Sequence, residues 1–436
     1  MIYERVLKSP DSFDFSIQNL GTCTFNSLGN PKFFINDSQR IAFSSQTENI
    51  VSQIENCKKL PSFEKAGPRS KLFHSPPKTR AAIVTCGGLC PGLNNIIKSL
   101  VNILDSEYGI SDVIGYRYGY RGLSTNSRQK YITLNRGLVD GIHKQGGTIL
   151  GSSRGAHDPN EMVDQLIADG VNILFCVGGD GTLKGAQSIV IEATRRNASI
   201  SIVGVPKTID NDIEFVEKTF GFETAVETAS KIIESAHYEA EGAENGIGIV
   251  KLMGRDSGFI AATASLANSV VDFCLVPEVE FHIDGPNGLT VALEKRLATN
   301  GHALIVVAEG AGQHLFEAKK KYKDPSGNVL KEDIGELLKA VISKALPADI
   351  KYLDPSYHIR SVPAIASDAV FCYHLAEHAV HAAMAGKTNV LIGYWNNFFT
   401  HVPIALATVE RRELDLDGVL WRGVMSATQQ GTILKN

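Results

Sequence analysis

The stretch NILFCVGGDGT, residues 172–182, joins a continuous apolar run to a glycine-rich turn, and LKGAQSIVIEATRR follows it with helical spacing. Strands that are apolar throughout are typical of parallel sheets, which crossover helices bury on both faces. Glycines let the backbone approach a ligand closely, and the N-terminus of a following helix presents free N–H groups to phosphate. The stretch therefore predicts a strand, a turn that accepts an anion, and a helix.

The same pattern recurs on both sides of this stretch. Apolar runs that end in Gly or Pro include AAIVTC (81–86), SIVGVP (201–206), IGIVKLMG (247–254), ALIVVAEG (303–310) and NVLIGY (389–394). A chain of 436 residues is longer than one core usually organises. The alternation predicts an α/β fold with two Rossmann-like open sheets that carry helices on both faces. Ligands bind beyond the carboxyl ends of the strands in such sheets.

The overall composition restricts the class of function. A formal net charge of -4 gives no broad attraction to nucleic acid or to anionic membranes, so any phosphate site must be local. The first residues, MIYERVLKSPDSFDFS, carry charges where a secretory signal needs an apolar core, and no apolar run approaches the ~20 residues of a membrane span. We expect a cytoplasmic protein whose seven scattered cysteines are reduced thiols.

Asp180 lies inside the glycine-rich turn. A carboxylate cannot bind phosphate directly, since both are anionic, but it can hold Mg²⁺, which prefers oxygen ligands. The alternative is an aspartate that caps the following helix near Thr182.

The segment PKTIDND, residues 206–212, follows another apolar run. Two carboxylates that are two residues apart at a strand end repel each other, which costs free energy unless they bind a cation or a substrate hydroxyl. A kinase that acts on an alcohol needs a base near the hydroxyl and cations around the phosphoryl group. Asp210 and Asp212 can meet the first need, with Lys207 and Thr208 facing the phosphoryl oxygens; the alternative is an acidic turn.

These segments together resemble the phosphofructokinase family. The motifs are GGLCPGLN (87–94), GGDGT (178–182), PKTIDND (206–212), KLMGRDSG (251–258), LVPEVEF (275–281), AEG (308–310) and DPSYHIR (354–360). This set of motifs is most similar to that of the ATP-dependent plant and trypanosomatid enzymes, and is close to that of the pyrophosphate-dependent branch. The resemblance implies an active site in the cleft between the two sheets, Mg²⁺ as cofactor, and ATP and fructose 6-phosphate as substrates.

The resemblance also implies a domain plan: an N-terminal extension over 1–75, a nucleotide domain over 76–220 joined by about 360–400, and a sugar-phosphate domain over 221–359 joined by about 401–436. It implies these catalytic residues: Asp210 as base, Asp212, Thr208 and Arg255. The donor and its metal would contact Gly88, Tyr120 near the adenine, Arg154, Gly155, Gly179, Asp180 as the Mg²⁺ ligand, Gly181, Thr182, Lys184, Gly185 and Lys207. Fructose 6-phosphate would contact Thr208, Asp210, Met253, Gly254, Arg255, Glu309, Lys351, Tyr357 and Arg360.

Two features depart from parts of the family. In bacterial relatives, arginines from a neighbouring subunit reach the sugar phosphate, and the corresponding positions here are Gly246 and Lys351. A homo-oligomer is expected, either a dimer or a tetramer.

Two motif residues point to different phosphoryl donors. The glycine at position 181 resembles the residue found there in ATP-dependent enzymes, whereas the lysine at position 207 resembles the residue found in pyrophosphate-dependent enzymes. An aspartate at 181 would obstruct the nucleotide, so the glycine favours ATP.

Other functions remain as alternatives: a pyrophosphate-dependent phosphofructokinase, a non-catalytic regulatory subunit of the family, an NAD or lipid kinase, or a dinucleotide-binding dehydrogenase. An NAD or lipid kinase or a dehydrogenase would leave the TIDND and MGR motifs unexplained, and no GxGxxG follows the first predicted strand. His374, His378 and His381 have near-helical spacing, which favours one polar helix face over a metal site. KKKYK at 319–323 is interpreted as a solvated charge run.

Overall fold

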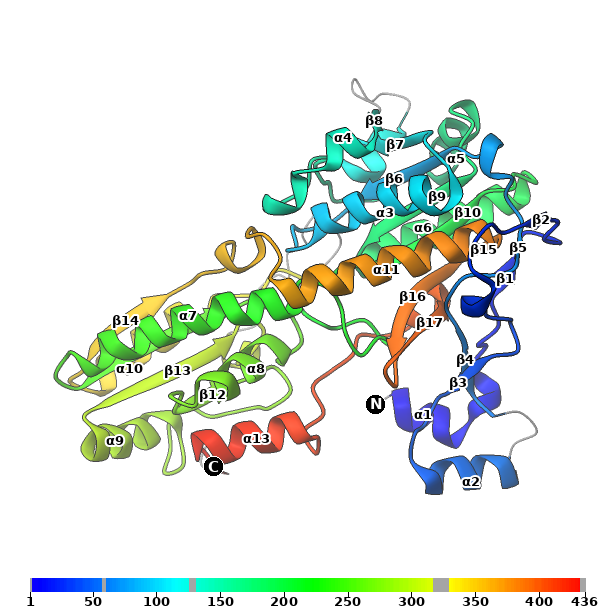
Figure 1. The fold of residues 1–436 in the computed structure, drawn as a ribbon. Coiled ribbons are helices and arrows are strands. Elements are labelled where there is room, and N and C mark those ends of the chain that lie inside the picture. The colour runs from blue at the N-terminus through cyan, green and yellow to red at the C-terminus, as the bar shows by residue number, and fades with distance from the viewer. Residues whose placement is uncertain (1, 57–59, 125–130, 317–328, 432–436) are drawn as a thin grey trace. The chain divides into compact units, whose positions relative to one another are not determined.

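The computed structural model in Figure 1 describes residues 2–56, 60–124, 131–316 and 329–431. The chain forms two compact units. Unit 1 contains Met1–Thr208, Ile213–Gly221 and Val362–Arg411, so the predicted N-terminal extension is part of it. Unit 2 contains Ile209–Asp212, Phe222–Ser361 and Arg412–Asn436. The basic run at 319–323 lies outside the described residues.

Unit 1 is built on a nine-stranded sheet with the order β3-β4-β17-β16-β10-β9-β6-β7-β8. Its central strands are parallel, and the pairs β7–β8, β16–β17, β17–β4 and β3–β4 are antiparallel. The strands are β3 (Arg40–Ala42), β4 (Ser62–Lys65), β6 (Ala81–Thr85), β7 (Val113–Tyr116), β8 (Tyr131–Leu134), β9 (Ile173–Gly178), β10 (Ser201–Pro206), β16 (Val390–Trp395) and β17 (Phe398–Pro403).

Helices cover both faces of this sheet. Ala82 and Val84 of β6 belong to one buried cluster with Met162 of α5 and Leu183 of α6, so one face packs against these helices. On the other face α3 and α11 run side by side, and α11 contacts β10 (Figure 1). The helices are α3 (Leu93–Tyr108), α4 (Arg136–Val139), α5 (Pro159–Ala168), α6 (Asp180–Arg195), α11 (Ala366–Met384) and α12 (Ile404–Ala407).

The N-terminal segment is bound into unit 1 by strand pairing. Its β3 and β4 extend the large sheet, β1 (Gln18–Asn19) pairs with β15 (Lys387–Thr388), and β2 (Phe25–Asn26) pairs with β5 (Lys71–Leu72). Its helices are α1 (Ile2–Lys8) and α2 (Thr47–Asn56). The polar, weakly periodic sequence of this segment did not predict these pairings. β2–β5 and β3–β4 form within the segment, whereas β1 and β4 also pair with β15 and β17, which lie far away in the chain.

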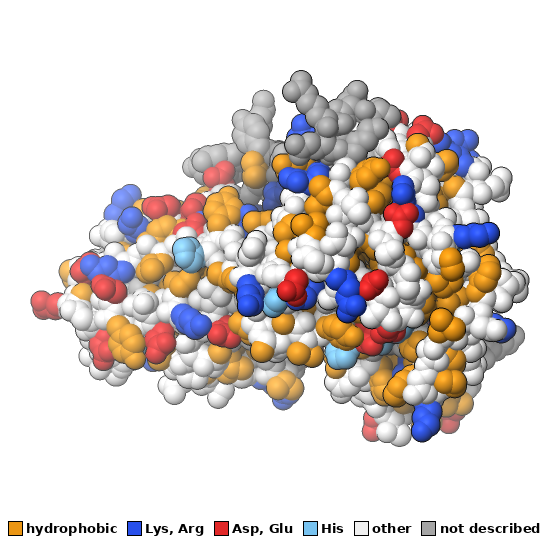
Figure 2. All heavy atoms as spheres, turned by 45° about the horizontal axis from the view of Figure 1, so that its top comes forward, with side chains coloured by type: hydrophobic (Ala, Val, Ile, Leu, Met, Phe, Trp, Pro, Cys, Tyr) orange, Lys and Arg blue, Asp and Glu red, His pale blue; other side chains and the backbone are white. Residues whose placement is uncertain are grey.

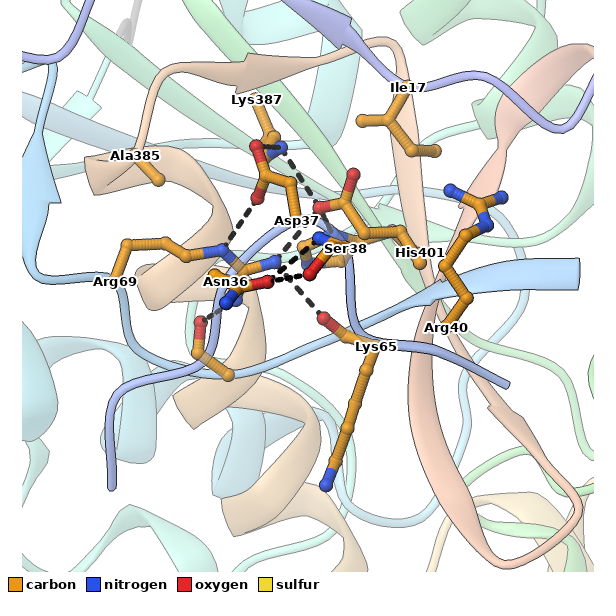
Figure 3. Close-up of polar contacts among 12 residues, drawn as sticks. Ile17, Asn36, Asp37, Ser38, Arg40, Lys65, Arg69, Ala385, Lys387 and His401 are labelled. Atoms are coloured by element: carbon orange, nitrogen blue, oxygen red, sulfur yellow. Dashed lines mark hydrogen bonds and ion pairs between the residues drawn. The ribbon is translucent and has the colours of Figure 1, made fainter. Parts of the chain in front are cut away.

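A buried ionic cluster joins the same segment to the end of unit 1 (Figure 3). One oxygen of Glu64 on β4 lies 2.9 Å from Arg69, Lys387 and His401 alike. Asp37 lies 2.8 Å from Arg69 and 3.0 Å from Lys387. Two carboxylates therefore neutralise two cations that are almost fully buried.

Unit 2 is built on a four-stranded parallel sheet with the order β12-β13-β11-β14. Ile247 and Ile249 of β11 pack in a cluster with residues of α9 and α10, while a Cβ on Gly248 would contact α7 on the other face. The strands are β11 (Gly246–Leu252), β12 (Phe273–Leu275), β13 (His302–Ala308) and β14 (Asp349–Leu353). The helices are α7 (Phe222–Glu241), α8 (Phe259–Asn268), α9 (Leu289–Asn300), α10 (Ile334–Ala345) and α13 (Val419–Thr428).

These two open sheets with helices on both faces confirm the predicted α/β fold class. Within the described residues, no helix combines the length and the apolar composition that a bilayer crossing requires. On the face drawn in Figure 2, basic and acidic side chains are interspersed and do not gather by sign. This face therefore offers no broad basic patch for a polyanion.

The prediction of one polar face for the three histidines is wrong. All three lie on α11, but His381 is only 4% exposed and the ring of His378 stacks on Phe399 at 4.4 Å. Burial lowers the pKa of His378 to about 4 and that of His381 to about 3, so both rings are neutral near pH 7. Only His374 keeps a half-exposed side chain.

Candidate active-site segments

Three predicted phosphate-binding segments follow neighbouring strands of unit 1. Strands β6, β9 and β10 are parallel and adjacent, with Thr85 paired to Val177 and Gly178 to Pro206. Their carboxyl ends therefore lie at one edge of the sheet. The segments that begin there contain Gly88, the Gly179–Thr182 turn, and Lys207 with Thr208, so the fold brings these residues together.

Lys207 links the three segments. Its backbone N–H donates to the Gly178 carbonyl at 3.1 Å, and its ammonium donates to the Gly88 carbonyl at 2.8 Å. The residue is only 6% exposed. Gly87 has φ +88°, and a Cβ there would lie 3.1 Å from the Lys207 ammonium. The lysine is thus a buried positive charge at the turn, and a side chain at 87 would crowd it.

The segment with Arg154 joins the same edge. The Gly87 N–H donates to the Ser153 carbonyl at 3.0 Å, and the Ser152 hydroxyl donates to the Gly87 carbonyl at 2.6 Å. Arg154 and Gly155 follow directly and are exposed. Gly155 has φ +111°, a conformation that favours glycine. Backbone hydrogen bonds therefore hold an exposed arginine beside the Gly87–Gly88 turn.

In the GGDGT turn, Gly179 is the N-cap residue of α6 and Asp180 is its first residue. One Asp180 oxygen lies 3.0 Å from the Lys184 ammonium, and no hydrogen bond from the helix N–H groups to its side chain is present among the described residues. The alternative in which Asp180 caps α6 is therefore wrong. Thr182 is buried, because its side chain covers Gly178.

The two glycines of α6 have opposite surroundings. A Cβ on Gly181 would meet no atom within 4 Å, so the space above this residue is open. A Cβ on Gly185 would lie 2.6 Å from the ring of Tyr120. Tyr120 is 6% exposed, and its hydroxyl donates to the Thr182 carbonyl at 2.7 Å. These contacts give Tyr120 a supporting position beneath the first turns of α6.

The PKTIDND segment crosses from unit 1 to unit 2 after Thr208. The Thr208 carbonyl accepts a hydrogen bond from the buried Thr219 hydroxyl at 2.8 Å. Asn211 adopts φ +53°, and the Asp212 carbonyl accepts from the Arg412 N–H at 3.0 Å. Asp210 and Asp212 are partly exposed. The backbone of the segment is fixed on both sides of the two carboxylates.

In unit 2, the residues after β11 and β13 form a second set. Arg255 has φ +52°, and its N–H donates to a Glu309 carboxylate oxygen at 3.0 Å. Met253 and Gly254 precede Arg255, and Gly254 has φ +147°. Glu309 follows β13, the direct neighbour of β11. The structure thus brings Met253, Gly254, Arg255 and Glu309 to one edge of the second sheet.

The remaining predicted sugar-phosphate residues lie on or after β14. The guanidinium of Arg360 lies 4.7 Å from the centre of the exposed Tyr357 ring, which is the geometry of a cation–π contact. Lys351 lies within the strand, and its ammonium contacts Asp349 at 3.0 Å. Gly246 has no side chain. At the two positions where arginines are expected in bacterial relatives, this chain therefore supplies one cation, Lys351.

Lys251 is a residue that the sequence prediction did not assign. Its side chain is 12% exposed, and its ammonium lies 2.7 Å from Asp333 and 2.9 Å from Asp354. Burial disfavours the charge, but the hydrogen bonds to the two aspartates outweigh it, so the pKa of Lys251 is raised. Because Asp354 begins the DPSYHIR segment, the lysine holds that segment to β11. A charged residue within the apolar run IGIVKLMG was the available signal.

The sequence of this chain is similar to those of known proteins. The family described as phosphofructokinase matches residues 80–383. The ATP-dependent 6-phosphofructokinase of Borreliella burgdorferi is 47% identical, over 98% of this chain and 99% of its own. That of Trypanosoma brucei brucei is 50% identical, over 84% of this chain and 76% of its own.

Among solved structures, the pyrophosphate-dependent phosphofructokinase of Marinobacter aquaeolei superposes with a TM-score of 0.66 at 19% identity, covering 82% of this chain and 92% of its own. At that identity the likeness concerns the fold alone. The resemblance predicted from the sequence motifs is confirmed by the family match and by the two close relatives. The chain belongs to the phosphofructokinase family.

Proposed function

We propose that this protein is an ATP-dependent 6-phosphofructokinase. It transfers the γ-phosphoryl group of ATP to the C1 hydroxyl of fructose 6-phosphate, giving fructose 1,6-bisphosphate and ADP. The observation that carries the choice of donor is the open space at Gly181, where a Cβ would meet no atom within 4 Å. Relatives with 47% and 50% identity are named as ATP-dependent enzymes, which supports the same donor.

In this proposal the donor phosphates lie on unit 1. The N-terminus of α6 presents backbone N–H groups, and the buried Lys207 and exposed Arg154 supply positive charge beside the Gly87–Gly88 turn. Thr208 follows Lys207 directly. Phosphoryl transfer is catalysed mainly by positioning and by neutralising charge, and these groups suit that task.

Asp180 suits the role of Mg²⁺ ligand. It stands at the first position of α6 and is partly exposed, and among the described residues Lys184 engages one of its oxygens. Mg²⁺ in such enzymes is held by one or two carboxylates together with substrate phosphate oxygens, so a single protein carboxylate is sufficient. The bound ion would neutralise charge on the donor phosphates.

Asp210 is the proposed base for the C1 hydroxyl, with Asp212 beside it. Arg255 would stabilise the charge of the transferring phosphoryl group, since Glu309 holds its backbone in place. Met253, Gly254, Glu309, Lys351, Tyr357 and Arg360 are the proposed contacts for the sugar phosphate. A homo-oligomer and a cytoplasmic location remain parts of the proposal that rest on the family.

A pyrophosphate-dependent activity is the second candidate, and Lys207 is the residue that favours it. The deciding experiment measures fructose 1,6-bisphosphate formation with ATP and with pyrophosphate at equal concentration and with Mg²⁺ present. We expect faster turnover with ATP. Faster turnover with pyrophosphate would overturn the assignment of the donor, and no turnover with either would overturn the assignment as an enzyme.

A further inference from the structure

One group of polar side chains in unit 1 lies outside the proposed active site. Glu107, in the last turn of α3, and Glu377 and His381, on α11, each offer one atom to a cluster in which all three atoms lie within 4.8 Å of one another. Glu377 and His381 are four residues apart on one helix, a spacing that places two side chains on the same face. Both helices belong to unit 1 and run side by side (Figure 1).

His381 is arranged as a metal ligand would be. The residue is only 4% exposed, and its Nδ1 shares a hydrogen bond of 2.7 Å with the Tyr108 hydroxyl. That bond fixes the ring and leaves Nε2 facing Glu107, whose oxygen is 3.9 Å away and beyond hydrogen-bond distance. Metal-binding histidines are commonly oriented by a hydrogen bond to their other ring nitrogen.

Within the described part of the chain, neither carboxylate has a lysine or arginine at ion-pair distance. Glu377 lies 3.0 Å from His374 and 3.9 Å from His378, and Glu107 lies 3.9 Å from His381. The ligand atoms of Glu107, Glu377 and His381 lie within 4.8 Å of one another, so the two carboxylates are close together. A bound divalent cation would neutralise both carboxylates and use the open Nε2.

We propose that Glu107, Glu377 and His381 form a binding site for a divalent transition-metal ion that ties the end of α3 to α11. One imidazole and two carboxylates suit Zn²⁺ or a similar ion better than Mg²⁺, which prefers oxygen ligands alone. Bonds of about 2.1 Å would bring the ligand atoms to about 3.4 Å from one another. The side chain of Glu107 is 38% exposed and can move inward to close this distance.

The test is equilibrium dialysis of the full chain against Zn²⁺ in excess Mg²⁺, comparing the wild type with Glu107→Gln and Glu377→Gln. We expect each variant to lose one Zn²⁺ per chain, or to bind it at least about tenfold more weakly. Tyr108→Phe should also weaken binding by about 10–100-fold, because it frees the His381 ring. Glu48→Gln, an exposed carboxylate on α2, is the matched control and should bind as the wild type does.

Thermal denaturation separates this site from metal bound elsewhere. Zn²⁺ should raise the midpoint of the wild type and of Glu48→Gln, and raise it less in the two cluster variants. Zn²⁺ binding of equal strength in the wild type, Glu107→Gln and Glu377→Gln would overturn the proposal, as would the absence of Zn²⁺ binding to the wild type. Glu107 is partly exposed, so its variant gives a result even if Glu377→Gln fails to fold.

Discussion

The Glu309 carboxylate accepts a hydrogen bond of 3.0 Å from the backbone N–H of Arg255, which is held at φ +52°. A positive φ is unfavourable for a residue with a side chain, so the neighbouring structure must stabilise it. The loop that contains Arg255 therefore depends on a hydrogen-bond acceptor from the residue that follows the neighbouring strand β13. Glu309 thus has a positioning role in addition to any contact with the sugar.

Two substitutions at Glu309 can separate these roles. The amide oxygen of Glu309→Gln can still accept from Arg255, whereas Glu309→Ala removes the acceptor. We expect kcat to fall about 10–100-fold more in the alanine variant, since a hydrogen bond to a charged group contributes about 1.5–3 kcal/mol. Steady-state kinetics with fructose 6-phosphate measures this. Equal kcat values in the two variants would refute the positioning role.

Asp210→Asn should lower turnover by about 10²–10⁴-fold while changing the KM values much less. A base acts only as the hydroxyl becomes nucleophilic, so its loss affects mainly kcat. Asp417→Asn replaces an exposed carboxylate of unit 2 and serves as control. If Asp210→Asn kept more than roughly a tenth of wild-type turnover, Asp210 would not be the base.

Gly181→Asp should sharply weaken the use of ATP. The space at this position is open, so the new side chain fits without disturbing α6, and its negative charge would repel the nucleotide phosphates. Gly181→Ala adds a Cβ without charge and should keep most of the activity. The KM for ATP of both variants tests this, and an equally large rise in both would mean that bulk alone is responsible.

Arg360→Ala should raise the KM for fructose 6-phosphate far more than the KM for ATP. A dianionic phosphate gains most from the fork of a guanidinium group, and Tyr357 orients this group through the cation–π contact. Arg422→Ala, at an exposed position of α13, provides the matched loss of charge in unit 2. Equal rises of both KM values would indicate that Arg360 supports the fold.

Because of Glu64, we expect the stability of unit 1 to depend on pH in the acidic range. Burial raises the pKa of its carboxyl group, but the hydrogen bond from His401 and the charge of Lys387 outweigh burial, and the pKa falls to about 2. The folded state therefore favours the ionised form, and this stabilisation is present above pH 4.5 and is lost between pH 4.5 and pH 2.

Glu64→Gln should lower the midpoint of thermal unfolding at pH 7, because among the described residues it leaves Asp37 as the one counter-charge to the buried Arg69 and Lys387. The difference between variant and wild type should shrink at pH 3, because below pH 4.5 the unfolded wild type binds a proton at Glu64 that the folded state does not bind, which lowers the stability of the wild type. A difference that is the same at both pH values would contradict this account.

The sequence predicted those parts of the site that depend on local pattern. Apolar runs followed by glycine or proline identified β6, β9 and β10, and parallel pairing then placed Gly88, Asp180 and Lys207 at one edge. The pattern could not reveal what each side chain contacts there. The engagement of Asp180 with Lys184 and the burial of Tyr120 depend on the packing around α6.

Residues whose partners lie far along the chain were predicted least well. The spacing of His378 and His381 indicated a helix correctly, but their burial results from packing against Phe399 and Tyr108. Likewise, Glu64 lies in a polar segment with no visible signal for the cations that it contacts. Burial of a polar side chain is set by the tertiary partner and not by helical or strand periodicity.

The pairing of β4 with β17 also constrains the order in which the chain can fold during synthesis. Glu64 contacts Lys387 and His401, so the ribosome must complete most of the polypeptide before these partners exist. Until then Arg69 and Glu64 can pair with each other, but the edge of β4 that later receives β17 has no partner strand. Contacts of such sequence separation are slow to form and leave strand edges exposed to aggregation. The nascent chain therefore carries an unfinished sheet through nearly the whole of translation, and slowing elongation would prolong the exposure of that edge.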